Sequence, residues 1–103
     1  MSKTPIEMIQ AERERQKKVE GWTEKHDDEH VNGQLADAAA CYATTWEEPY
    51  ILDTKNSPVQ RIWPWDGKWD KRKKHHRVKC LVIAGALIVA ELERLQRKEA
   101  KET

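Results

Sequence analysis

The sequence contains no phenylalanine and has only two cysteines, four glycines and four prolines among its 103 residues. Without phenylalanine, a hydrophobic core has to be built from aliphatic side chains, alanines and some of the five tryptophans. A chain of this length is large enough for one core but not for two. We therefore expect a single domain, residues 1–103, with a small core.

The two cysteines, Cys41 and Cys80, are too few and too far apart for a disulfide framework or a zinc site. Both lie in apolar stretches, where a reduced thiol behaves as a small hydrophobic side chain. We expect two reduced core residues, and a bridge between them is the less favoured alternative.

The sequence also lacks a segment that is long and apolar enough to cross a membrane. The apolar run from Cys80 to Ala90 has about half of the ~20 residues that a membrane-spanning helix needs, and charged residues flank it. Residues 1–16 contain neither the apolar core nor the cleavage site of a secretory signal. We expect a cytoplasmic protein with no membrane partner.

No serine or cysteine nucleophile motif, P-loop or dinucleotide-binding fingerprint occurs, so no motif assigns a reaction. The formal net charge of +1 hides a separation of charge along the chain. Acidic residues gather between residues 20 and 29, and basic residues gather between residues 68 and 79. The placement of charge is therefore more informative than its sum.

Three segments have helical patterns, and we expect a mainly α fold, a small three-helix bundle. The first helix, residues 5–20, begins with the capping box Thr4-Pro5-Ile6-Glu7 and ends before Gly21, which favours a left-handed cap. The second, about residues 29–46, has apolar residues at helical spacing: Leu35, Ala38, Ala39, Tyr42 and Trp46.

The third helix, about residues 74–98, is the most apolar. One face carries Val78, Leu81, Val82, Gly85, Ile88, Leu92 and Leu95, and further apolar residues cover most of its other faces up to Ala90. A helix that is apolar nearly all round is buried nearly all round, so we expect this helix to be the buried spine of the domain. Beyond Ala90 the pattern narrows to one stripe, which is either solvated or part of an oligomer interface.

Residues 47–72 lose the helical pattern and contain three of the four prolines. We expect a long irregular loop rich in tryptophan and proline between the second and third helices. Residues 50–52 and 59–62 can alternatively pair as a minor hairpin.

The segment from Gly21 to His30 holds the densest set of potential ligands. If it is helical, His26 and His30 lie one turn apart, a spacing that can hold a transition metal, and the neighbouring carboxylates suit magnesium. The candidate metal ligands are Asp27, Asp28, Glu29, His30 and Asp37. No cofactor is certain, and magnesium is the candidate. Alternatively, the acidic residues favour the start of the second helix through capping and the helix dipole.

A second candidate feature combines three indoles, Trp63, Trp65 and Trp69, with the basic run that follows them. Indoles stack on bases and cations attract phosphates, so a nucleotide-like molecule can bind between this loop and the Gly21 to His30 segment. The candidate ligand-binding residues are Trp22, His26, Asp27, Asp28, His30, Trp63, Trp65, Asp66, Trp69, Arg72, Lys73 and Arg77.

The basic run has a structural alternative. Cations are unfavourable at the start of a helix, because the helix dipole is positive there. The basic groups before the third helix therefore need a partner, and we favour the acidic segment around Asp27 and Asp28 over an external phosphate.

The chain resembles a widespread family of small, uncharacterised phage and prophage proteins. The resemblance rests on an ordered series of segments, Glu12 to Gln16, Glu20 to Thr23, His26 to His30, Gly33 to Ala43, Trp63 to Asp66, and Val78 to Leu95. It implies a phage protein that acts in the host cytoplasm.

A weaker resemblance links the chain to the all-α, MazG-like nucleotide pyrophosphohydrolases, through the run Gln34-Leu35-Ala36-Asp37. That family has an acidic residue where this sequence has Gln34, and a Glu-x-x-Asp motif that the third helix lacks. The resemblance implies a magnesium-dependent pyrophosphohydrolase, for which Asp27, Asp28, Glu29, Asp37 and Glu91 are the available carboxylates.

Our leading hypothesis is a non-enzymatic phage accessory protein that binds a phosphate-bearing small molecule or a host protein, in nucleotide metabolism or as a host-defence antagonist. The pyrophosphohydrolase is the alternative enzyme hypothesis. A third hypothesis is a protein-interaction module that inhibits a host factor through the Glu91 to Arg97 stripe and the first helix, and that forms a homo-oligomer.

Overall fold

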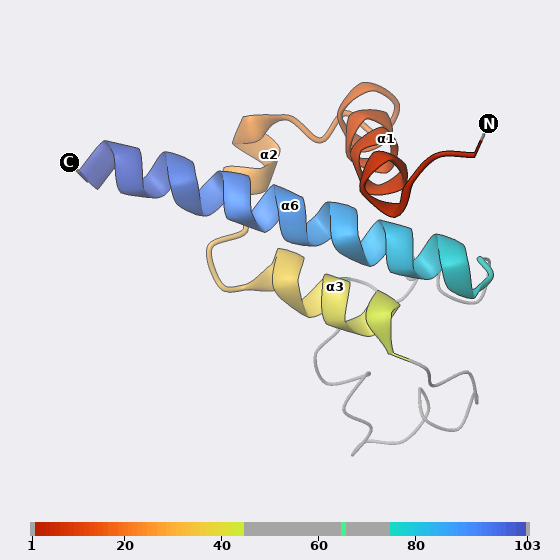
Figure 1. The fold of residues 1–103 in the computed structure, drawn as a ribbon. Helices are drawn as coiled ribbons and strands as arrows, with labels where there is room; N and C mark the ends of the chain where they lie inside the picture. The colour runs from red at the N-terminus through yellow and green to blue at the C-terminus, as the bar shows by residue number, and fades with distance from the viewer. Residues whose placement is uncertain (1, 45–64, 66–74, 103) are drawn as a thin grey trace, which may run out of the picture.

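The computed structural model describes residues 2–44, 65 and 75–102. These residues form helices α1 (Pro5–Lys18), α2 (Glu24–Asp28), α3 (Gln34–Ala43) and α6 (Arg77–Glu102), and no strand occurs among them. Helix α6 runs through the middle, with α1 and α2 along one side and α3 along the other (Figure 1). The predicted mainly helical fold is confirmed.

The second predicted helix is wrong in its bounds. Instead of one helix over residues 29–46, the chain forms the short α2 and then, after a break, α3. Two local features cause the break. The Thr23 side chain accepts a hydrogen bond from the His26 N–H and so starts a helix early, and Gly33, at φ +80°, holds a left-handed conformation before α3.

The other predicted bounds are close to those observed. The capping box at Thr4 and Glu7 is present, and Gly21 has the left-handed conformation expected of it, with φ +74°. Helix α6 continues to Glu102, beyond the predicted end at residue 98. The predicted hairpin at residues 50–52 and 59–62 lies outside the described residues, as does all of the predicted loop, residues 47–72, except Trp65.

The hydrophobic core lies between α3 and α6. Its members on α3 are Leu35, Ala38, Ala39 and Tyr42, and its members on α6 are Cys80, Ile83, Ala84, Leu87 and Ala90. Cys41 and Cys80 are both buried and reduced, as the sequence predicts. Trp22 and Trp65 pack against this core from outside.

Helix α1 packs on α6 largely through polar side chains. Glu12, Arg13 and Gln16 are buried, while Ile6 at one end is 74% exposed. Ile9 makes an apolar contact with α6, since its side chain lies directly against Gly85. A Cβ atom at Gly85 would come within 2.6 Å of Ile9 Cδ1, so the absence of a side chain there lets the two helices approach.

The prediction that α6 is buried nearly all round is wrong. Its neighbours cover the faces that carry Ile83, Leu87 and Arg94, but the face that carries Leu81, Ile88 and Leu92 is about half exposed. The reason is that α1, α2 and α3 pack on only part of the helix circumference. Among the described residues, no helix combines the length and apolar character needed to cross a membrane.

Candidate ligand-binding site

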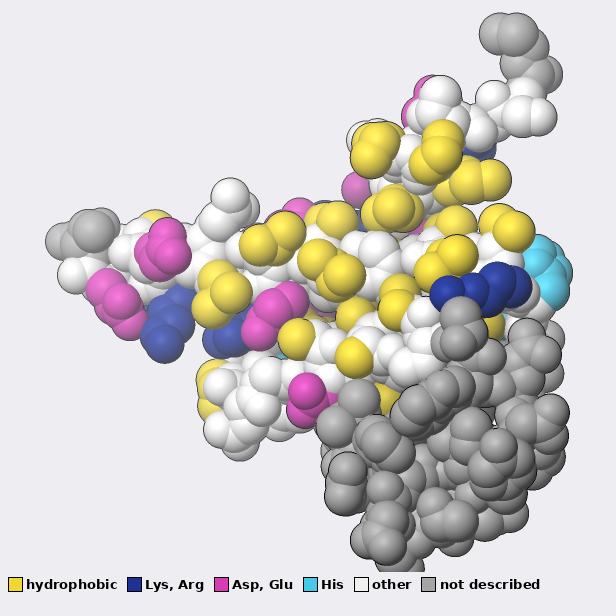
Figure 2. Space-filling model, turned by 60° about the horizontal axis from the view of Figure 1, so that its bottom comes forward, with side chains coloured by type: hydrophobic (Ala, Val, Ile, Leu, Met, Phe, Trp, Pro, Cys, Tyr) yellow, Lys and Arg dark blue, Asp and Glu magenta, His cyan; other side chains and the backbone are white. Residues whose placement is uncertain are grey.

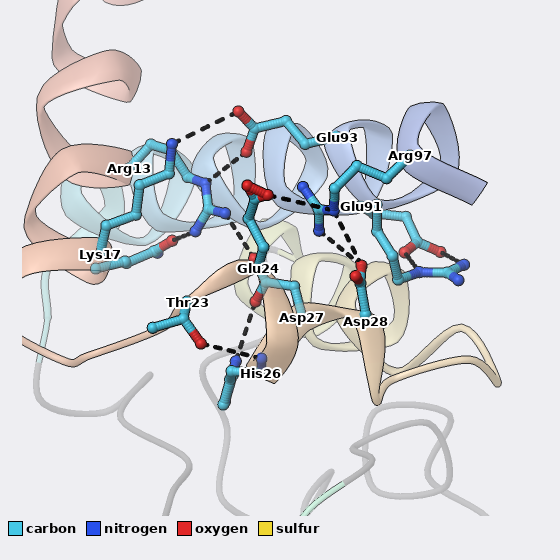
Figure 3. A network of polar contacts seen from close by, with 12 residues as sticks. Arg13, Lys17, Thr23, Glu24, His26, Asp27, Asp28, Glu91, Glu93 and Arg97 are labelled. Atoms are coloured by element: carbon cyan, nitrogen blue, oxygen red, sulfur yellow. Dashed lines mark hydrogen bonds and ion pairs between the residues drawn. The ribbon is translucent and has the colours of Figure 1, made fainter. Parts of the chain in front are cut away.

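An ion pair buried between α1 and α2 supports the candidate site. Arg13 Nη2 of α1 donates to Asp27 Oδ2 of α2 over 2.6 Å, and the two side chains are only 4% and 0% exposed. Arg13 Nε also donates to Glu93 Oε1 of α6 over 3.0 Å (Figure 3). One guanidinium therefore joins three helices. Arg suits this position because its planar group donates in several fixed directions.

The remaining polar atoms in this interface are also paired. Arg13 Nη1 donates to Gln16, Gln16 donates to Glu12, and Glu12 accepts from Lys79 Nζ of α6 over 2.9 Å. Burial acts to raise the pKa of Glu12, but hydrogen bonds from Arg15 and Lys79 outweigh it, and the net direction is downward. No buried side-chain nitrogen or oxygen among the described residues lacks a partner. Full pairing is what makes buried charges tolerable.

Asp27 also fixes the orientation of a histidine. His26 Nδ1 lies 3.0 Å from Asp27 Oδ1, and the His26 backbone N–H donates to Thr23 Oγ1 over 3.2 Å. The indole of Trp22 stacks on the imidazole of His26, with ring centroids 5.4 Å apart and an interplanar angle of 10°. The imidazole is thus held by a carboxylate at one edge and by an indole on one face.

Two further rings continue this arrangement. His30 meets His26 edge-on, with centroids 4.9 Å apart, and Trp65 meets His30 edge-on at 5.3 Å. We call Trp22, His26, His30 and Trp65 the aromatic cluster. All four are partly exposed. Four partly exposed aromatic rings therefore lie together beside a buried ion pair.

The electrostatics of His30 favour its neutral form. Burial lowers the pKa of His30, and the neighbouring His26 lowers it further, against the opposing effect of Asp27 and Glu29. At neutral pH the ring therefore has one nitrogen that donates and one that accepts. Such a ring can stack and can also form hydrogen bonds with an uncharged polar edge.

The structure brings together part of the predicted ligand-binding set. Trp22, His26, His30 and Trp65 are in ring contact, and Asp27 lies beneath them. Five other predicted residues lie outside the described residues, namely Trp63, Asp66, Trp69, Arg72 and Lys73.

Two predicted ligand-binding residues have other roles. Asp28 accepts from Arg97 Nε and Nη2 over 3.1 and 2.8 Å, which ties α2 to the far part of α6. Arg77 donates to the backbone carbonyls of Ala43, over 2.8 Å, and of Thr44, and so caps the end of α3. Carbonyls at a helix end lack partners within the helix and attract cations.

These contacts also correct the expected partner of the basic residues before the third helix. Of the described residues in that run, Arg77 binds the end of α3 and Lys79 pairs with Glu12. The acidic segment pairs instead with Arg13 and Arg97. The preference for an internal ion pair between the two segments is therefore wrong for Arg77 and Lys79.

The predicted metal ligands do not form a metal site in the part of the chain that the structure describes. Among those residues, no group of three or more His, Cys, Asp or Glu side chains is arranged to hold a metal ion. Asp27 is bound by Arg13 and His26, and Asp28 is bound by Arg97, so the carboxylates of these two nominated residues already have cationic or imidazole partners. The described donor set does not fit a magnesium ion.

Sequence reasoning missed the residues that support the site, Glu12, Arg13 and Gln16. The available signal was their spacing, because positions 12, 13 and 16 share one face of a helix with Ile9.

No protein-family model matches this chain, and comparisons with curated proteins and with solved structures find no match.

Proposed function

We propose that this chain is a non-enzymatic phage accessory protein that binds a phosphate-bearing small molecule with a planar ring, of the nucleotide class, at the aromatic cluster. The phage origin rests on the sequence resemblance. The binding proposal rests on one observation, the aromatic cluster held above the buried ion pair of Arg13 and Asp27.

The construction of the cluster favours binding because the rings are held in place before a ligand arrives. His26 is held by Asp27 and Trp22, and Asp27 is held in turn by Arg13. A site that is ordered in advance loses less entropy on binding. Stacking of a base on an aromatic side chain contributes about 1–3 kcal/mol. A planar ligand that stacks on one of these partly exposed rings can therefore gain useful affinity.

The phosphate part of the ligand needs a cation near the rings. Arg77 is no longer a candidate, because its guanidinium binds the carbonyls at the end of α3. Arg72 and Lys73 keep their place in the proposal on sequence grounds, since they follow Trp65 by seven and eight residues. Their contribution can be measured directly by substitution.

The pyrophosphohydrolase alternative requires metal-holding carboxylates, and the described residues at positions 27 and 28 do not supply them. In-line attack on a phosphoryl group needs carboxylates that hold a metal, and the described carboxylates at positions 27 and 28 are occupied by arginines. This is why binding without turnover is the function that the site favours.

Thermal stabilisation by a panel of nucleotides tests the proposal. A ligand at about 100 times its Kd stabilises the folded state by about 2.7 kcal/mol, which is a shift of several degrees for a domain of this size. We expect such a shift for the wild type and a much smaller one for Trp22→Ala and for His30→Gln. The matched control is His76→Gln, which changes an exposed histidine outside the cluster and should leave the shift intact.

Incubation of the same nucleotides with magnesium separates binding from catalysis. We expect no release of pyrophosphate at high protein concentration. The proposal is wrong if no nucleotide in the panel shifts the melting temperature, or if His76→Gln weakens the shift as much as His30→Gln does. Release of pyrophosphate that depends on the protein would favour the enzyme instead.

A further inference from the structure

The described part of the chain exposes apolar or aromatic side chains on the open face of α6 and at the aromatic cluster. Hydrophobic side chains gather along α6 (Figure 2), and Leu81, Ile88 and Leu92 are among the exposed ones. Burial of such groups is favourable but not directional, so it selects a partner weakly. The aromatic cluster also contains two imidazoles, whose nitrogens form directional hydrogen bonds. Chemical selectivity is therefore a property of the cluster.

The hydrogen on the His26 ring has a defined position. Asp27 is the anionic member of the ion pair with Arg13, and a carboxylate anion only accepts hydrogen bonds. The contact of 3.0 Å between His26 Nδ1 and Asp27 Oδ1 therefore requires the hydrogen on Nδ1. In the neutral imidazole the other ring nitrogen, Nε2, is then a hydrogen-bond acceptor.

The Nε2 atom of His26 reaches the surface of the protein. The polar contact of the His26 side chain is made by Nδ1, and Nε2 has no hydrogen bond to any residue that the structure describes. Every solvent-shielded side-chain nitrogen or oxygen in the buried and half-buried residues of that part has a hydrogen-bond partner. Nε2 is therefore accessible, in agreement with the 36% exposure of the His26 side chain. The ring offers a free acceptor to a ligand.

This acceptor is held in place by its neighbours. Trp22 stacks on the His26 ring, His30 meets it edge-on, and Asp27 binds Nδ1. Rotation of the ring by half a turn would place a carbon beside Asp27 Oδ1 and leave this buried oxygen without its imidazole partner, which is unfavourable. Nε2 thus keeps one position before a ligand arrives, and little entropy is lost when it binds a donor.

The second imidazole of the cluster has no fixed hydrogen. The contacts of the His30 ring are with the rings of His26 and Trp65, and no described side chain forms a hydrogen bond with its nitrogens. Its hydrogen can therefore occupy either nitrogen and adapt to a donor or an acceptor. His26 discriminates between ligands, whereas His30 tolerates both kinds of edge.

We propose that His26 selects the base of the bound nucleotide, because its Nε2 accepts a hydrogen bond from an amino group on the edge of the base. This inference rests on the proposed function and narrows its ligands to nucleotides with an aminated base. A fixed acceptor attracts an N–H donor and repels a carbonyl oxygen at the same place. The amino group of adenine, cytosine or guanine meets this requirement.

Calorimetric titration without magnesium tests the selection with three matched pairs of nucleotides. The probes are ATP, CTP and GTP, each paired with the triphosphate that lacks only the amino group, namely purine riboside triphosphate, pyrimidin-2-one riboside triphosphate and ITP. One net hydrogen bond corresponds to about fivefold in affinity. We expect the wild type to bind at least one aminated nucleotide about fivefold more tightly than its pair.

Two variants of His26 remove the acceptor in different ways. His26→Phe keeps a flat ring without nitrogens, and His26→Asn keeps an N–H donor for Asp27 but has no atom in the place of Nε2. Both should bind the two members of each pair with equal affinity while they keep their helical circular dichroism. The matched control is His76→Gln, which lies outside the cluster and should keep the discrimination of the wild type.

NMR of the ¹⁵N-labelled wild-type protein without a ligand determines the position of the ring hydrogen directly. We expect the neutral His26 ring to carry it on Nδ1, and a hydrogen on Nε2 would overturn the inference. Equal affinity within every pair, with binding intact, overturns the inference and leaves the proposed function standing, as does discrimination that persists in His26→Phe. Absence of binding for all six nucleotides overturns both.

Discussion

Replacement of Asp27 by asparagine tests the structural basis of the candidate site. Asparagine keeps the shape of the side chain but removes its negative charge, so that Arg13 loses its fully buried partner and keeps Glu93, which is 34% exposed. Removal of one member of a buried ion pair costs about 3–5 kcal/mol, because the other charge stays buried. A domain of this size has a total stability of about 5–15 kcal/mol. We therefore expect Asp27→Asn to remove a large part of the stability of the fold.

Urea unfolding followed by circular dichroism measures this loss. The matched control is Asp28→Asn, one residue along, whose carboxylate is 33% exposed and pairs with the partly exposed Arg97. Solvent screens such a pair, so its loss should be small. Asp27→Asn should unfold at a much lower urea concentration than Asp28→Asn, with a similar slope. Equal midpoints for the two variants would refute the role assigned to the buried pair.

Three further predictions concern other described positions. Burial lowers the pKa of His30, so on acidification its imidazole is protonated in the unfolded chain at a higher pH than in the folded chain. The stability that depends on neutral His30 is therefore complete above about pH 6.5, and it is lost as the pH falls toward the lower folded pKa. His30→Gln should therefore weaken the fall of the unfolding free energy between about pH 7 and about pH 5, and an unchanged pH profile would contradict this. Gly85→Ala gains about 1 kcal/mol of helix propensity, but the new methyl group clashes with Ile9. It should therefore change the urea midpoint little in the wild type and raise it in an Ile9→Ala background. The same effect in both backgrounds would argue against the contact. Gly33→Ala should cost about 1–2 kcal/mol in the same assay because its φ of +80° is unfavourable for alanine, and a neutral result would argue against the left-handed turn before α3.

The features that the sequence predicted well are local ones. The start of α1 depends on Thr4 and Glu7, which lie within one turn, and the end of α1 depends on Gly21 a few residues on. The apolar pairing of α3 with α6 follows from periodicity in each helix. The break between α2 and α3 is also local, because it depends on the Thr23 cap and on the left-handed Gly33. The apolar spacing of the second predicted helix begins only at Leu35, so it did not fix where that helix starts.

The features that the sequence did not predict depend on contacts across the chain. The pairing of Arg13 with Asp27 and Glu93 joins positions 14 and 80 residues apart, and no spacing rule connects them. Arg77 was assigned to a phosphate or to the acidic segment, because the carbonyls at the end of α3 are invisible in the sequence. Helix α6 shows a further limit, because the face that carries Leu81, Ile88 and Leu92 is as apolar as the buried faces, and the pattern alone does not show which faces the chain covers.

The candidate site was predicted in part for a physical reason. Trp22, His26 and His30 are neighbours in sequence, and four-residue steps place rings on one side of the chain even though the helix ends between them. The contact of His30 with Trp65 depends on the tertiary fold, and the sequence anticipated it only through the charge and aromatic content of the two segments.

Ligand binding at the aromatic cluster is measured most directly by NMR of the indole N–H groups, with Trp22→Phe used to assign the Trp22 signal. Titration with a nucleoside triphosphate without magnesium should shift the Trp22 and Trp65 signals along saturable curves, and His30→Gln should weaken the apparent affinity. Indole signals that stay in place up to millimolar nucleotide would contradict a ligand site at these rings.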